Sequence, residues 1–123
     1  MNVIVRDDGF HAEDWDGPVT EIAPDTDPAA LPALADGAGL VRVAFPAFND
    51  GRGFTLARRL RAAGYTGRLR ASGHVLADQY AMARRSGFDE VEISADLAAR
   101  QPAPQWQARA DWGQHDYRAR LKG

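Results

Sequence analysis

The chain has 123 residues and a formal net charge of −2, and it contains no cysteine. The length suits one domain, residues 1–123. The lack of cysteine excludes disulfides, thiol catalysis and thiolate metal sites. Because a net charge near zero is not typical of a general nucleic-acid-binding protein, we expect no nucleic-acid partner.

The charges are unevenly distributed along the chain. Residues 1–50 carry ten acidic and two basic side chains, whereas residues 51–123 carry seven acidic and thirteen basic ones. Residues 52–85 hold eight arginines and one acid, Asp78. We therefore interpret residues 1–38 as an acidic arm that covers the basic centre of the chain, in the same subunit or in a neighbouring one.

No targeting or membrane segment is visible. The first nine residues lack a basic stretch followed by a long apolar run, which a signal peptide would show. No stretch approaches the roughly 18 apolar residues of a membrane span. We expect a bacterial, cytoplasmic protein with no membrane partner.

The acidic arm contains two short apolar stretches, residues 3–5 and 19–22, which favour strands. A turn is expected between them at Asp8-Gly9, and the second strand is expected to pair back with the first. A short helical turn is predicted at residues 29–34. The arm is thus expected to be rich in β-structure.

The centre, residues 39–101, alternates predicted strands with predicted helices. Strands are predicted at residues 40–45, 68–72 and 90–93, and helices at residues 54–63 and 75–86. A short last helix, capped by Ser94, is predicted to follow. This alternation predicts an α/β fold with a small parallel sheet built from consecutive βαβ units. The open edges of such a sheet need cover from the arm or from another subunit, so we expect a homo-oligomer.

Both main helices are expected to end in the same way, with a glycine and then an aromatic residue: Gly64-Tyr65 and Gly87-Phe88. Glycine suits the left-handed position that follows a helix. On the first helix, helical spacing predicts a buried face formed by Leu56, Ala57, Leu60 and Ala63. The arginines of the two helices are most simply solvated: Arg58, Arg59, Arg61, Arg84 and Arg85.

The C-terminal tail, residues 102–123, contains Trp106, Trp112 and Tyr117 among polar residues. Large aromatic side chains are common both in cores and at interfaces. Two interpretations stay open, a helix packed on the sheet and a contact with a second copy or a partner.

Polar residues gather where the predicted parallel strands end. Ligands of open α/β sheets bind outside these carboxyl ends. The residues expected at this rim for binding an anion or a partner are Asp50, Gly51, Arg52, Gly53, Arg70, Asp78 and Gln79. Candidate catalytic residues are Asp50, Arg52, His74 and Asp78.

Arg52 stands between two glycines at a predicted helix start. A guanidinium can hold an oxyanion bidentately, and glycine allows the backbone to approach closely. The simpler alternative is that Asp50 caps the helix and the glycines only turn the chain. Arg70 lies in the middle of a predicted strand, where we expect it to pair with Asp78 or Asp50 or to be solvated at an edge.

Sequence motifs for cofactors and metals are missing. No two histidines have metal-ligand spacing, and neither GxxxxGK[ST] nor GxGxxG occurs. We therefore expect no cofactor and no metal site.

Three stretches carry a resemblance to a known family: FPAFNDGRGFTLAR (residues 45–58), GYTGRLRASGHVLADQ (64–79) and RRSGFD (84–89). They resemble a bacterial family of uncharacterised domains that is described as predicted oxidoreductases involved in sulfite reduction. The family pattern is FPxFxDGRG, LRAxGxVLxDQ and RCGFD. The resemblance covers roughly residues 40–93 and includes all seven binding candidates at the rim.

The sequence also departs from this pattern. Ser86 stands where the family often has cysteine, so a redox thiol is not available there. Arg68 and His74 stand where acidic residues are common in the family. These departures weaken the description as an oxidoreductase for this chain.

The resemblance implies an accessory protein of assimilatory sulfite reduction, which binds the sulfite reductase or a small oxyanion through the rim. One alternative is an enzyme that acts on an anionic sulfur or phosphate compound. Another is a structural oligomerisation module without a ligand.

Overall fold

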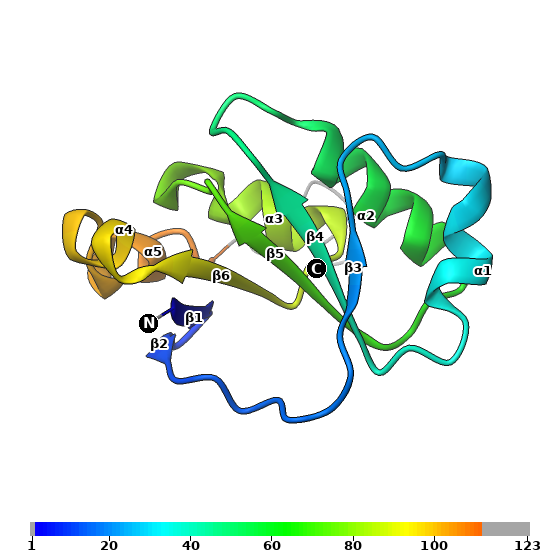
Figure 1. The fold of residues 1–123 in the computed structure, drawn as a ribbon. Helices are drawn as coiled ribbons and strands as arrows, with labels where there is room; N and C mark the ends of the chain where they lie inside the picture. The colour runs from blue at the N-terminus through cyan, green and yellow to red at the C-terminus, as the bar shows by residue number, and fades with distance from the viewer. Residues whose placement is uncertain (1, 112–123) are drawn as a thin grey trace, which may run out of the picture.

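The computed structural model describes residues 2–111. The chain folds around a six-stranded sheet (Figure 1). The strands are β1 (Asn2–Arg6), β2 (Gly9–His11), β3 (Thr20–Ile22), β4 (Leu40–Phe45), β5 (Arg68–Gly73) and β6 (Glu90–Ser94). Their order across the sheet is β2-β1-β6-β5-β4-β3. Neighbours from β3 to β6 are parallel, whereas β1 is antiparallel to β6 and to β2. The predicted α/β class is therefore confirmed, and the sheet is mostly parallel.

Within residues 2–111, five α-helices and two short 3₁₀ helices accompany the sheet. They are η1 (Pro28–Ala30), α1 (Leu31–Ala35), α2 (Arg52–Ala62), η2 (Ala77–Gln79), α3 (Tyr80–Ser86), α4 (Ala95–Arg100) and α5 (Ala103–Gln107). In the chain, α2 stands between β4 and β5, and α3 stands between β5 and β6; the two helices contact each other. No helix within residues 2–111 has the length and apolar content needed to cross a membrane.

The acidic arm supplies strands to both edges of the sheet. The expected pairing of residues 19–22 with the first strand is wrong, because β3 lies at the opposite edge, parallel to β4, with Thr20 opposite Val41. The first strand instead forms a hairpin with β2, in which Ile4 faces His11. Gly9, with a φ of 121°, opens this hairpin's second strand. Both expected open edges of the parallel centre are thus covered by the arm.

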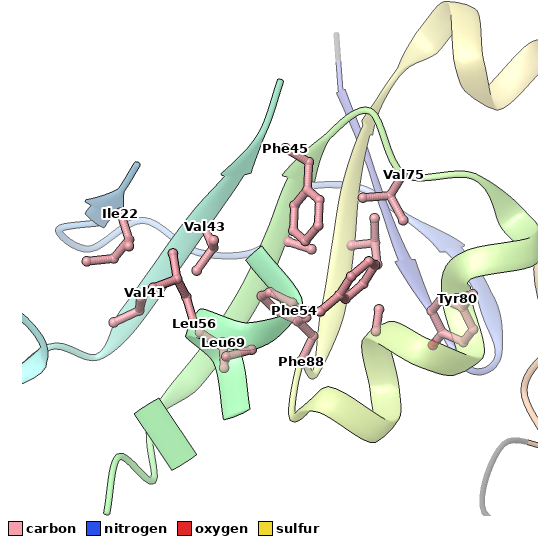
Figure 2. Close-up of a cluster of buried hydrophobic side chains, with 14 of the residues drawn as sticks. Ile22, Val41, Val43, Phe45, Phe54, Leu56, Leu69, Val75, Tyr80 and Phe88 are labelled. Carbon is pink, nitrogen blue, oxygen red and sulfur yellow. The ribbon is translucent and has the colours of Figure 1, made fainter. Parts of the chain in front are cut away.

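Alternating residues of the strands divide the sheet into an apolar and a charged face. In β4, Val41, Val43 and Phe45 are buried in the main hydrophobic cluster with residues of α2 and α3 (Figure 2). The Phe45 ring lies 4.9 Å from Phe54 and 5.8 Å from Phe88, centre to centre. The helices α2 and α3 therefore cover this apolar face.

The opposite side of the sheet, here called the charged face, consists of Arg6 (β1), Arg42 (β4), Arg68 and Arg70 (β5), and Glu90 and Glu92 (β6). Residues 12–19, here called the strap, run from β2 at one edge to β3 at the other (Figure 1). Glu13 and Asp14 of the strap form ion pairs with arginines of the charged face. The acidic arm thus covers the basic centre within the same subunit, as predicted.

The ends of the two main helices follow the predicted pattern. Gly64 and Gly87 have φ values of 100° and 115°, and Tyr65 N–H donates to the Leu60 carbonyl across the first of these turns. The prediction for Ala63 is wrong, because this residue is exposed where α2 ends.

Arg61 does not belong to a solvated helix face, contrary to expectation. Its guanidinium donates to the Gly87, Tyr65 and Gly67 carbonyls at 2.8–3.0 Å. It also pairs with Asp89 at 3.0 Å. Arg61 therefore ties the ends of both main helices together.

The tail begins with a buried anchor. Trp106 of α5 is fully buried, and its Nε1 donates to the Gln101 carbonyl at 2.7 Å. Its ring meets Tyr80 edge-on at 6.0 Å. Trp106 therefore belongs to the core, while Trp112 and Tyr117 lie outside the described residues.

Candidate functional site

The loops after β4 and β5 meet at the carboxyl end of the sheet, where the rim was predicted. His74 N–H donates to the Phe45 carbonyl at 2.9 Å, and Gln79 Nε2 donates to the Phe48 carbonyl at 2.9 Å. Gln79 Oε1 also accepts from the Leu76 N–H at 2.9 Å. Gln79 thus links the two loops through both ends of its amide group.

Asp50 and Arg52 bind each other. The Asp50 carboxylate accepts from Arg52 Nε at 2.9 Å and Nη2 at 2.6 Å, and it also accepts from the Arg52 backbone N–H at 3.2 Å. The Arg52 side chain lowers the pKa of Asp50, and the hydrogen bond to Asp50 raises the pKa of Arg52. The Arg52 side chain is nevertheless 57% exposed, so it faces solvent at the start of α2 with its charge already partnered.

The two glycines of this loop differ in what they permit. A Cβ on Gly53 would lie 2.4 Å from the Phe45 ring, so glycine allows this ring to pack against the first turn of α2. A Cβ on Gly51 would meet only Phe54, at 4.0 Å. The glycine at position 53 therefore has a packing role, and the structure shows no steric requirement at position 51.

Arg70 does not join the rim loops. Its side chain is completely buried on the charged face, where Nε donates to Glu90 at 2.6 Å and Nη1 to Glu92 at 2.9 Å. Glu13 of the strap accepts from both terminal nitrogens at 2.7 Å. The expected carboxylate pairing of Arg70 is confirmed, but the expected partners, Asp78 and Asp50, are wrong.

Burial alone would lower the pKa of Arg70, but the hydrogen bonds to Glu13 and Glu90 outweigh it and raise this pKa. The same contacts act on Glu13, whose pKa is lowered chiefly by the hydrogen bond from Arg70. Both groups are therefore held in their charged forms.

Asp78 has a different partner from Arg52. Its carboxylate accepts from Arg109 at 2.7 Å, and both side chains are largely exposed. The charged candidates thus have three different sets of partners: Asp50 and Arg52 pair with each other, Arg70 pairs with Glu13, Glu90 and Glu92, and Asp78 pairs with Arg109.

An exposed aromatic pair stands on the rim. The rings of Phe48 and His74 meet edge-on at 5.0 Å, and Phe48 is 40% exposed. Asp50 N–H donates to the Ala47 carbonyl at 3.1 Å, so one tight turn carries both Phe48 and Asp50. We call Phe48, Asp50, Arg52 and His74 the rim patch. An exposed aromatic ring and an exposed guanidinium on one short loop suit contact with a protein surface.

Sequence reasoning missed the charged face as a unit. In the central strands, charged residues alternate with apolar ones. Arg42 lies between two valines in β4, Arg68 and Arg70 flank Leu69 in β5, and Glu90 and Glu92 flank Val91 in β6. Because residues two apart in a strand point to the same face, this alternation was the signal that could have found it. Within residues 2–111, no group of three or more histidine, aspartate or glutamate side chains could hold a metal ion.

Comparison with protein families gives a match over most of the chain. No curated protein and no solved structure matches the chain. Residues 20–121 match a family described as "Bacterial protein of unknown function (DUF934)". Because this match spans most of the sequence, the chain belongs to the bacterial family DUF934.

Proposed function

We propose that this protein is a non-catalytic accessory factor of assimilatory sulfite reduction that binds the sulfite reductase through the rim patch. The observation that carries the proposal is the exposed Phe48–His74 pair on a loop that also carries the exposed guanidinium of Arg52, four residues after Phe48. The identity of the partner rests on the resemblance of residues 45–89 to the family described as involved in sulfite reduction.

A protein partner suits the rim patch better than a free oxyanion. Asp50 already occupies Arg52 with two hydrogen bonds, so a small anion would have to displace this carboxylate. A protein surface can bury Phe48 and contact the outer edge of Arg52 while the ion pair stays intact. Aromatic residues and arginine often carry most of the binding free energy at interfaces.

The alternatives are less well supported. An enzyme that uses Asp50, Arg52, His74 and Asp78 would need them around one substrate, whereas Asp78 is bound to Arg109. Oligomerisation through the sheet would use the edge strands β2 and β3, which have only three residues each. Such short edge strands offer few backbone groups to a second copy.

The test is a binding measurement with immobilised protein and purified sulfite reductase. We expect Phe48→Ala and Arg52→Ala each to weaken binding by about tenfold or more, as expected for central interface residues. Met82→Ala and Arg58→Ala are matched controls, because Met82 is 48% exposed on α3 and Arg58 is exposed on α2. Absence of binding, or equal loss in variants and controls, would contradict the proposal.

A second measurement tests whether the protein binds a small oxyanion, as the oxyanion and enzyme alternatives require. Sulfite, sulfate and phosphate are each added in a thermal unfolding experiment, with chloride at equal ionic strength as control. We expect no rise in Tm beyond the chloride control. A rise that Arg52→Ala abolishes would favour the anion-binding alternative.

A further inference from the structure

We propose that the arginines of the charged face form a binding site for an acidic, extended segment of a protein partner. In this structure the chain's own Glu13 and Asp14 occupy that site. The strap is then an internal competitor of the partner, and the partner must displace the strap in order to bind. This site is distinct from the rim patch and does not depend on the function proposed above.

The geometry is that of a bound acidic peptide. Glu13 accepts from both terminal nitrogens of Arg70 at 2.7 Å, which is a bidentate carboxylate–guanidinium pair. The next residue, Asp14, accepts from Arg6 at 2.9 Å and from Arg68 at 2.5 Å. Two consecutive acidic residues thus form ion pairs with three arginines from two strands, β1 and β5.

Side chains alone attach the strap to the sheet. Within the described part of the chain, every hydrogen bond between residues 13–18 and the strands comes from a side chain. Trp15 adds a cation–π contact, with its ring 5.9 Å from the Arg68 guanidinium carbon. The side chains of Glu13 and Asp14 remain 45% and 51% exposed. The strap can therefore leave without breaking a backbone ladder.

On the charged face beneath the strap, the Arg70 guanidinium is held in a position to bind a carboxylate. Glu90 and Glu92 hold the Arg70 guanidinium in place, and Glu90 also pairs with Arg6 and Arg68. Without the strap, the charged face and its neighbour Glu21 on β3 would present four arginines and three glutamates. This excess of positive charge, together with the buried site of Arg70, favours an anionic replacement.

Space for a partner lies beside the strap. A cavity of about 580 Å³ is lined by Asn2, Ile4, Ala12, Glu13 and Glu92. Glu13 forms part of its wall, so a bound segment could continue into this cavity next to the carboxylate that replaces Glu13. An acidic peptide is therefore a better fit than an isolated small anion, which would leave the cavity unused.

The test compares the wild-type chain with the double variant Glu13→Gln/Asp14→Asn, which keeps the strap but removes its charges. The probe is a labelled synthetic peptide, HAEDWDGP, which copies residues 11–18. We expect the variant to bind it at least about tenfold more tightly than the wild type, because the internal competitor is weakened. The affinity should fall as salt is added.

Two controls make this result specific. The variant Asp16→Asn/Asp36→Asn removes two exposed acidic charges that form none of the ion pairs described above, and it should bind like the wild type. The amide peptide HAQNWNGP should bind neither protein tightly. Equal binding of the acidic and amide peptides, or equal binding by the variant and the wild type, would overturn the proposal.

A second variant covers the case in which the double variant does not fold. Trp15→Ala removes the contact with Arg68 while every arginine of the charged face keeps its carboxylate. It should bind the acidic peptide more tightly than the wild type, by a smaller factor than the double variant. If Trp15→Ala binds the peptide no better than the wild type, the strap does not compete for the site and the proposal fails.

Discussion

The two faces of the sheet are built from the same strands by different physical means. On the apolar face, Val41, Val43 and Phe45 are covered by helices that join the strands. On the charged face, Arg68 and Arg70 are covered by a strap that comes from the arm. An apolar face can be buried by any element of suitable shape, whereas buried charges need partners at defined positions.

This difference determines how each face responds to change. Apolar packing involves no charges that salt can screen or that a proton can neutralise. The charged face is a connected network in which Glu90 binds Arg6, Arg68 and Arg70 at once. Loss of one member therefore affects several others, and the response depends on pH.

The largest loss is expected on the apolar face. Phe88 is fully buried, so Phe88→Ala should lower the free energy of unfolding by about 3–5 kcal/mol. Urea unfolding at low and high salt measures this loss, which should be the same in both. Phe48→Ala is the matched control, because Phe48 is 40% exposed and should change stability by less than about 1 kcal/mol. Similar losses in the free energy of unfolding for the two variants would contradict the placement of Phe88 in the core.

The next largest loss is expected from Arg70→Met on the charged face. Removal of one member of a buried ion pair costs about 3–5 kcal/mol. We expect the lower end of this range, because Glu90 keeps Arg6 and Arg68, and Glu92 keeps Arg42. Urea unfolding at pH 7 measures the loss. In the Arg70→Met background, Glu13→Gln should cost less than it does in the wild type, because the Glu13 carboxylate has already lost Arg70; equal costs in the two backgrounds would argue against a coupled network.

The stability should also fall in acid through the strap. Hydrogen bonds from Arg68 and Arg6 lower the pKa of Asp14 from 3.8 to about 2. A carboxyl with a lowered pKa in the folded state stabilises fully above its unfolded value and loses this contribution as the pH falls through the folded value. The urea midpoint of the wild type should therefore drop between about pH 4 and pH 2. Glu13→Gln/Asp14→Asn should show a smaller drop, and an identical pH dependence would contradict the role of the strap.

The smallest effect is expected at the edge of the charged face. Glu21 of β3 pairs with Arg42 in an exposed position. Exposed pairs contribute roughly 0.2–1 kcal/mol, so Glu21→Gln should lie within this range. The difference from wild type should vanish at 1 M salt, because exposed charges are screened there. A larger loss would mean that Glu21 belongs to the buried network.

Local patterns predicted most of the central elements. The strand at residues 40–45 has the predicted bounds, and β5 and β6 each extend one residue further. Ser94 caps α4 by accepting from the Leu97 N–H at 3.1 Å, as expected. These features depend on neighbouring residues, so the sequence carries them directly.

Features that depend on distant partners were not predictable in the same way. The predicted strand at residues 19–22 corresponds to β3. Its pairing with β4, and not with the first strand, depends on the whole sheet. One of the three carboxylate partners of Arg70, Glu13, lies 57 residues earlier in the chain. At the rim, the sequence placed Asp50 and Arg52 near the start of a helix, but it did not show that they bind each other.

The sequence by itself therefore determined the α/β class, the central strands and the glycine-ended helices, because propensity, periodicity and capping act over a few residues. It also indicated, through its uneven charge, that the acidic arm covers the basic centre. Only the tertiary structure decided which carboxylate meets which arginine, as in the different partners of Arg52, Arg70 and Asp78. Charge attraction has no fixed sequence spacing, so only the folded sheet selects the partners.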